Sequence, residues 1–292
     1  MGGLLRALGA GGSFLGQKCV PGRAAVVSEE SEELWAERLG VMPVGEHAAV
    51  LPRPFRTRPS PAEWRALVDE AAGRAAAGAL DLFVVDPLAS FLPTRSENDA
   101  GSMLDALLPV QAVAAAGAAV LVLHHPKKAP AEEGSTARGS GALTGFVDVV
   151  LELTRFGRLR SDNRCRRLAG FARFHDTPRE LFYTWDPSTG AFAVVDDPHA
   201  VQFRANWEQV HAILSGRTAA ATHLELLTDW PANQPPPGRT ALYAWLNRAY
   251  EEKLVRRSGE GTKTNPYRFR LTNEDDEYYD RGELPPLRLD RW

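Results

Sequence analysis

The sequence predicts an α/β fold built around a parallel sheet, followed by a smaller module of helices that ends in a β-hairpin. Two patterns predict the sheet: short, wholly apolar runs, and amphipathic segments that alternate with them between residues 23 and 153. The length of 292 residues is enough for two modules, each with its own core.

The elements of the first module follow from this alternation. Its central runs are apolar at every position, as expected of strands buried on both faces. Ser31 is placed to cap the first of the helices, and Gly78 to stop the second. The predicted strands are residues 24–27, 82–85, 118–123 and 147–153, and the predicted helices are residues 31–39, 61–77 and 99–116.

Residues 155–180 predict a strongly basic hairpin. They hold eight arginines against Asp162, Asp176 and Glu180, with strand-like runs at 168–174 and 181–185. So many like charges repel one another unless phosphate or acid neutralises them. A solvated face is the alternative, but the composition favours nucleic acid or a nucleotide as the partner.

The second module begins after a break at residues 196–198. Helices are predicted at 206–214, 222–228 and 239–253, and two strands at 254–257 and 267–270 flank a loop of Gly, Lys and Thr. Three helices followed by a hairpin describe a winged helix-turn-helix. The predicted DNA contacts on its recognition helix and wing are Arg239, Thr240, Tyr243, Arg248, Arg256, Arg257 and Lys263. A winged helix that binds protein is the alternative. Trp207, Trp230 and Trp245 are predicted core residues.

Composition excludes several classes of protein. Lys and Arg number 34 against 37 Asp and Glu, a net charge of -3, so any nucleic-acid surface must be local. Cys19 and Cys165 are far apart, which excludes a disulfide framework and a structural zinc site. The longest apolar stretch, residues 110–123, is too short to span a bilayer. We therefore expect a cytoplasmic protein.

Polar residues follow three of the predicted strands. They are Glu29 and Glu30, then Asp86, then His124 and His125. Open parallel sheets bind their ligands at the carboxyl edge, where these residues are expected to meet. Nucleotide hydrolysis requires an acid for water, an acid for magnesium and a polar group near the γ-phosphate. Each residue alone is weak evidence for such a site. An Asp before Pro is most often a turn former, and a His at a strand end more often has a structural role.

In this order the residues resemble the RecA-like ATPases, most closely the RepA-type hexameric replicative helicases. The resemblance covers roughly residues 1–185, and it is carried by residues 14–16, 26–31, 82–88, 121–128 and 137–143. It implies a RecA-like three-layer fold, ATP and Mg²⁺ as cofactors, DNA as partner and a ring-shaped homo-oligomer, a hexamer.

The resemblance also implies roles for particular residues. Glu30, or its neighbour Glu29, corresponds to the water-activating carboxylate, Asp86 to the magnesium ligand and His125 to the sensor. A loop facing the central channel and DNA would hold Lys127, Lys128 and Arg138. The paired basic fingers that reach a neighbour's γ-phosphate correspond to Arg173 and His175. His175 departs from the usual arginine, so Arg173 or Arg179 is the alternative finger.

The largest departure from the family is the phosphate loop. No G-x-x-x-x-G-K-[ST] occurs: Gly134 and Gly139 have the first spacing, but Ser140 stands where Lys is required. Residues 2–8 look like the rear part of the helix that follows such a loop. Either the reading frame continues upstream and encodes an apolar strand and this loop, or the domain is truncated and inactive. Starting at Met1, the sheet would lack a strand expected between those ending at Glu30 and Asp86.

Three segments are therefore expected: an ATPase domain at 1–195, a winged helix at 200–271 and an acidic, disordered tail at 272–292. The predicted function is that of an ATP-dependent, DNA-binding ATPase in replication or recombination, with the 292-residue form itself inactive as an ATP hydrolase. The alternatives are a non-enzymatic DNA-binding or regulatory protein on a degenerate ATPase domain, and an ATPase of this fold that never translocates.

Overall fold

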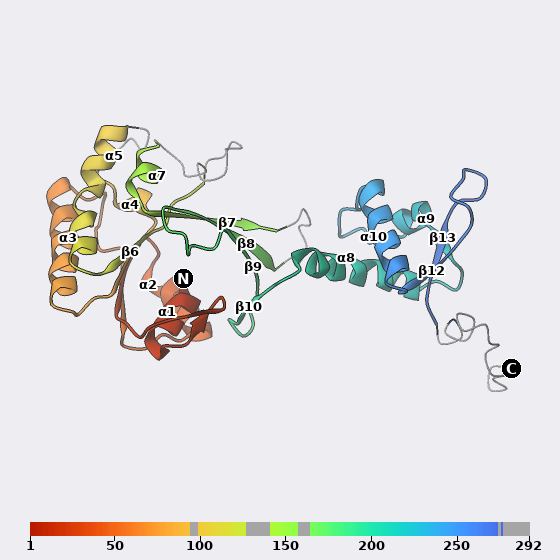
Figure 1. Cartoon of the computed structure of the whole chain (residues 1–292), viewed down its shortest axis with the longest axis horizontal. Coiled ribbons are helices and arrows are strands. Elements are labelled where there is room, and N and C mark those ends of the chain that lie inside the picture. The colour runs from red at the N-terminus through yellow and green to blue at the C-terminus, as the bar shows by residue number, and fades with distance from the viewer. Residues whose placement is uncertain (94–98, 127–140, 157–163, 274–275, 277–292) are drawn as a thin grey trace. The chain divides into compact units, whose positions relative to one another are not determined.

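The computed structural model describes residues 1–93, 99–126, 141–156, 164–273 and 276 (Figure 1). The chain divides into two compact units, the first of residues 1–156 and 164–196, the second of residues 157–163 and 197–292. Among the described helices, none has the length and apolar character needed to cross a membrane.

The first unit is built on a four-stranded parallel sheet with the order β4-β3-β5-β6. Its strands are β3 (Ala24–Ser28), β4 (Ala48–Pro52), β5 (Leu82–Asp86) and β6 (Ala119–Val122). Three of the four predicted strands, residues 24–27, 82–85 and 118–123, are confirmed in this sheet. The fourth, residues 147–153, is a strand as well, but it was wrongly expected in the parallel sheet, because it pairs antiparallel in a second sheet. Strand β4 was not predicted, although residues 48–51 form an apolar run as long as that of residues 24–27. The proline that ends β4 is tolerated because β4 is an edge strand.

Strands β3 and β5 pair directly, which corrects one expectation. Ala24 lies opposite Leu82 and Ser28 opposite Asp86, with every residue between them in register. Direct pairing leaves no place for a further strand between these two, so the expected position of the upstream strand was wrong. Both strands are apolar on both faces and occupy the centre of the sheet, so each is the buried neighbour that the other needs.

Helices cover both faces of this sheet. One face packs against α3 (Pro61–Ala76), α4 (Leu88–Phe91), α5 (Ala100–Leu107) and α6 (Val110–Ala115), and the other against α1 (Gly2–Ala10) and α2 (Glu32–Val41). Successive strand residues alternate between the two cores: Val27 and Val85 belong to the first, Val26 and Val84 to the second. The result is an α/β structure consistent with a RecA-like core.

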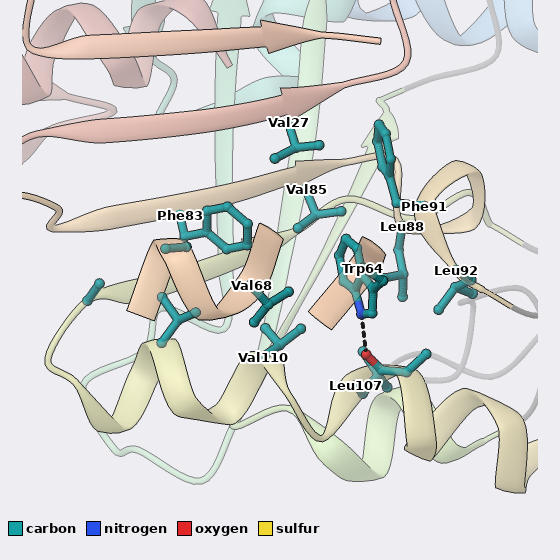
Figure 2. Packing of buried hydrophobic residues seen from close by; sticks show 14 of the residues in the cluster. Val27, Trp64, Val68, Phe83, Val85, Leu88, Phe91, Leu92, Leu107 and Val110 are labelled. Atoms are coloured by element: carbon teal, nitrogen blue, oxygen red, sulfur yellow. Dashed lines mark hydrogen bonds between the residues drawn. The ribbon is translucent and has the colours of Figure 1, made fainter. Parts of the chain in front are cut away.

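The predicted helix at 99–116 is two helices, α5 and α6, separated at Pro109. Proline has no amide hydrogen to donate, so it favours the start of a new helix over the interior of a long one. Near the end of α5, the carbonyl of Ala106 accepts the indole N–H of Trp64 at 2.8 Å (Figure 2). This bond and the burial of Trp64 fix α3 against α5.

A second, antiparallel sheet completes the first unit, with the order β10-β9-β8-β7. Its strands are β7 (Val149–Arg155), β8 (Cys165–Ala172), β9 (Glu180–Trp185) and β10 (Phe192–Val194). Strands β8 and β9 form the predicted hairpin. The remaining elements are β1 (Ser13–Phe14), β2 (Gln17–Lys18) and α7 (Ala142–Phe146).

The second unit contains three helices and a small antiparallel sheet of order β11-β13-β12. Its elements are α8 (Pro198–Ser215), β11 (Ala221–Thr222), α9 (His223–Thr228), α10 (Arg239–Glu251), β12 (Val255–Ser258) and β13 (Arg268–Leu271). Phe203, Leu242, Leu246 and Phe269 are central to its core. The three tryptophans predicted for the core are partly buried against it.

Candidate functional site

The carboxyl edge of the parallel sheet gathers the residues that follow its central strands. Because Ser28 and Asp86 are paired, Glu29 comes directly after a residue opposite Asp86, and its amide donates to the Asp86 carbonyl at 3.0 Å. On the other side of β5, the amide of Leu123 donates to Val85 at 2.9 Å. The chain after β6 therefore leaves the sheet beside Asp86.

The two glutamates after β3 are held by different partners. Glu29 accepts a hydrogen bond from the Ser90 hydroxyl at the start of the segment after β5. Glu30 forms a forked ion pair with Arg38 of α2, in which Nη2 lies 2.5 Å from Oε1. The guanidinium of Arg38 also lies 5.6 Å from the centre of the Trp35 ring. Side chains of neighbouring residues are thus directed to opposite sides of the edge.

Asp86 is half-buried, and desolvation raises the pKa of its carboxyl, as does the nearby charge of Glu30. The charges of Arg38 and of the Met1 amino group act in the opposite direction on this pKa. A carboxylate in such surroundings gains from a nearby cation. Magnesium is commonly held by one or two carboxylates together with phosphate oxygens, so Asp86 fits that role.

The described residues contain no group of three or more His, Cys, Asp and Glu side chains able to hold a metal ion. A magnesium ion at Asp86 would therefore take its other ligands from phosphate and water. The charge of the Met1 amino group, which precedes α1, lowers the pKa of Asp86, and the charge of Asp86 raises the pKa of that amino group. A helix N-terminus carries partial positive charge and favours anions.

Arg53 also reaches this edge. It follows β4, its amide donates to the Ser28 carbonyl at 2.7 Å, and its Nε donates to the Glu29 carbonyl at 3.0 Å. Sequence reasoning missed Arg38, Ser90 and Arg53 as site residues. Arg38 could have been found, because it lies about two helical turns beyond Ser31, the cap of α2, and so returns to the side of the helix near Glu30.

The other residues of the predicted nucleotide site are placed as follows. His125 is exposed and lies three residues after β6. Arg173, His175 and Arg179 are exposed in the turn between β8 and β9. In the described part of the chain, no hydrogen bond or ion pair joins these three to Glu30, Asp86 or His125. Lys127, Lys128 and Arg138 lie outside the described residues.

Acidic side chains form ion pairs with some of the arginines of the basic hairpin. Arg167 pairs with Glu180, Arg164 lies 3.7 Å from Asp186, and Arg173 lies 3.9 Å from Asp148. Three of the eight arginines therefore have an acidic neighbour, which reduces the positive charge left for a phosphate partner.

The predicted DNA contacts on α10 fall on two sides of the helix. Arg239 and Thr240 are exposed in its first turn, and Tyr243 lies beside His223 with ring centres 4.5 Å apart. Arg248 points elsewhere: its Nε donates to Glu252 at 2.7 Å and its guanidinium lies 4.6 Å from the Phe203 ring of α8. Arg248 therefore contacts the core side of the unit.

The arginines of the β12–β13 hairpin are also engaged. Arg256 and Arg270 lie opposite each other, and both pair with Asp276, which is 3% exposed. Arg257 lies between the rings of Tyr250 and Tyr267, 4.3 Å from each centre. Lys263 is exposed in the loop between the strands. Apart from Asp276, the acidic tail after residue 273 lies outside the described residues.

Residues 3–131 match a protein-family model described as an AAA domain. The matched segment includes α1 and the whole parallel sheet, with Glu29, Glu30, Asp86 and His125 at its carboxyl edge. The match supports an AAA or P-loop ATPase-like family and a nucleotide-binding ATPase type of function. Domains of this type generally bind ATP and Mg²⁺. None of the curated proteins compared with the chain matches it.

Proposed function

We propose that this chain is an ATP-dependent, DNA-binding ATPase of the RecA/RepA helicase type that acts in DNA replication or recombination. The observation that carries the proposal is the carboxyl edge, where paired strands bring Glu29 and Glu30 beside a half-buried Asp86. The family match over residues 3–131 supports its ATPase part.

In this proposal each edge residue has a separate task. Asp86 holds magnesium, which when bound would polarise the terminal phosphate of ATP. Glu30 orients water and accepts its proton, using a carboxylate lone pair that Arg38 leaves open. His125 senses the γ-phosphate from the segment after β6. The phosphate cradle is supplied by a segment other than the 292 residues, which contain no such loop.

Such a segment would bring an apolar strand with it, and the sheet offers that strand two free edges. The outer sides of β4 and β6 have no neighbouring strand among the described residues. A strand added there would extend the sheet without disturbing the pairing of β3 with β5.

The ATPase part is tested by measuring phosphate release from MgATP with the 292-residue protein and with a form extended upstream. We expect the extended form to hydrolyse ATP, and Asp86→Asn and Glu30→Gln each to lower its rate at least about 100-fold, as loss of a metal ligand or a base does. Glu70→Gln is the matched control, because Glu70 is exposed on α3 and pairs with Arg74 of the same helix. Hydrolysis that survives Asp86→Asn contradicts the assignment.

For the second unit we propose a winged helix-turn-helix that binds duplex DNA. Support comes from Arg239 in the first turn of α10 and Lys263 in the hairpin loop, which are exposed and have no ion pair in the described part of the unit. Because several other cations are paired with acids, few charges are free for phosphate. Binding of the full chain should therefore weaken with salt at a shallow slope, and Arg239→Ala and Lys263→Ala should each reduce that slope by about one.

A ring-shaped homo-oligomer, a hexamer, completes the proposal. Its support is the exposed turn between β8 and β9, where Arg173, with His175 or Arg179, is accessible to a neighbouring copy. Light scattering with and without MgATP measures the assembly. Arg173→Ala should lower hydrolysis in the extended protein without changing nucleotide affinity, as loss of a trans-acting cation does.

The second candidate function is a non-enzymatic DNA-binding or regulatory protein. It is favoured by the contacts of the two glutamates, because Arg38 and Ser90 already occupy carboxylate oxygens that catalysis would use. DNA binding by the second unit together with no hydrolysis by either form would make this the better description.

A further inference from the structure

Helix α10 presents one face to the core of the second unit and another outward. Leu242, Leu246 and Ala249 are fully buried, whereas Thr240 and Asn247 are exposed. These two are seven residues apart, about two helical turns, so they lie in line on the same side. Asn247 was not among the residues that the sequence singled out.

A side chain from the hairpin fixes Asn247 in place. The Nη1 of Arg257 donates to Oδ1 of Asn247 at 3.4 Å, and the same guanidinium is stacked between the rings of Tyr250 and Tyr267. Gly261 keeps the hairpin loop against this stack, since its φ is +75° and a Cβ there would come within 2.7 Å of the Tyr267 ring. Arg257 is thus held on three sides.

This contact decides which end of the amide faces outward. A guanidinium has only donors, so the atom that faces it must be the amide oxygen and not the nitrogen. Oδ1 has a second lone pair left over, and Nδ2 donates to no atom in the described residues. Asn247 therefore presents one acceptor and one donor side by side on the exposed face of α10.

In the major groove, adenine presents the complementary pair, with N7 as acceptor and the N6 amino group as donor. Guanine presents two acceptors there, so it would leave Oδ1 facing another acceptor. We propose that Asn247 reads an adenine in the major groove, and that Arg257 is a positioning residue that holds the amide for this contact. The proposal rests on the proposed binding of duplex DNA by this unit.

The charges around Asn247 suit contacts with bases, and cations elsewhere in the unit suit contacts with phosphate. Glu251 follows one turn later on the same face and repels phosphate, so this part of α10 is suited to base edges, which carry no net charge. Arg239 in the first turn and Lys263 in the hairpin loop are the exposed cations suited to phosphate. Arg257, predicted from the sequence as a DNA contact, acts instead through Asn247.

The experiment is selection of binding sites from a random duplex pool by the full-length protein, with affinities then measured on the selected site. We expect one position to require adenine. Asn247→Ala should lower affinity for that site about 10-fold, within the range for losing a bidentate base contact, and leave affinity for unrelated duplex unchanged. Asn233→Ala is the matched control, because Asn233 is exposed in the turn before α10.

Two further variants separate base reading from folding. Asn247→Asp keeps an acceptor for Arg257 but loses the donor, so the preference should change from adenine to cytosine, whose N4 amino group donates. Arg257→Met should abolish the preference while non-specific binding remains, and Arg257→Lys should restore part of it. Thermal melting of each variant shows whether the second unit is still folded.

The outcomes are distinct. An adenine preference that survives Asn247→Ala, or duplex binding by the wild type with no preferred base, overturns this inference alone. Failure of the wild type to bind duplex DNA at about 50 mM salt overturns the proposed DNA binding, and this inference with it.

Discussion

Charged residues have different surroundings at the carboxyl edge of the parallel sheet and on the hairpin surface of the second unit, which is formed by β12, β13 and Asp276. At the sheet edge, the main chain places Glu29, Glu30 and Asp86 together through the pairing of β3 with β5. On the hairpin surface, the arrangement depends on ion pairs between side chains, and Arg256 and Arg270 both pair with Asp276. Residue positions that the backbone determines can be predicted from the strand pattern. Whether an individual arginine is free to bind a ligand depends on which acidic side chain lies next to it.

The largest effect is expected where the sheet edge depends on its supporting core. Trp64→Ala removes a side chain that is 1% exposed and hydrogen bonded to Ala106, and should cost about 3–5 kcal/mol. Calorimetry of the full chain should show the transition of the first unit lowered and that of the second unchanged. Trp245→Ala, in the second unit, is the reciprocal variant. Equal effects of both variants on both transitions would show that the units do not unfold separately.

The hairpin surface should respond strongly to loss of its buried acid. Asp276→Ala leaves Arg256 and Arg270 without their shared carboxylate, at a cost of about 1–3 kcal/mol, less than for a fully buried pair because both arginines are partly exposed. Glu252→Ala, which breaks the more exposed pair with Arg248, is the control and should cost less than about 1 kcal/mol.

The same residue makes the second unit sensitive to acid. The hydrogen bond from Arg270 holds the pKa of Asp276 below its usual range. A carboxyl with a lowered pKa in the folded state stabilises that state above the unfolded pKa of about 4, and this contribution is lost as the pH falls further. Asp276→Asn should reduce that acid sensitivity in a pH series of thermal melts.

Helix caps allow a matched comparison of the two units. Ser60 caps α3 and Thr222 caps α9, each in a reciprocal arrangement with a glutamate three residues later. Ser60→Ala and Thr222→Ala should each cost about 1 kcal/mol, each in its own unit. Ser258→Ala, at an exposed strand end, should change neither transition. A cap variant that lowers both transitions equally would contradict the separation of the units.

Much of the first unit could be predicted because its signals are local. Runs such as residues 82–85 are apolar throughout, which is typical of a central strand of a parallel sheet. The edge strand β4 also has an apolar run, residues 48–51, but proline follows that run directly and weakens the strand signal. The break at Pro109 competes with a continuous helical pattern on both sides. The error about a strand between β3 and β5 arose because strand order depends on packing between distant segments, which no local pattern records.

The sheet edge was predicted in outline, and its side-chain partners were not. Strand ends gave Glu29, Glu30 and Asp86 their place, but whether Glu30 meets Arg38 depends on rotamers and on the turn into α2. In the second unit, counting arginines overstated the free charge, since their partners Glu252 and Asp276 are acids that the count did not assign. Asn247 gave no signal, because a single exposed asparagine is common on helices.

The smallest expected effect is the most informative about the sheet edge. Burial and the charge of Glu30 raise the pKa of Asp86, so ionisation of this carboxyl is less favourable in the folded than in the unfolded protein. Its contribution to stability is therefore full below the unfolded pKa of about 4 and is lost as the pH rises through the folded pKa. Asp86→Asn, which stays neutral, should raise the melting temperature of the first unit at pH 7 by a few degrees, and the gain should vanish near pH 4. Glu70→Gln, at an exposed position of α3, should change nothing. Residues kept for function at the expense of stability behave in this way. A lower melting temperature for Asp86→Asn at pH 7 would show that the Asp86 carboxylate stabilises the folded protein without a bound cation, which contradicts this prediction.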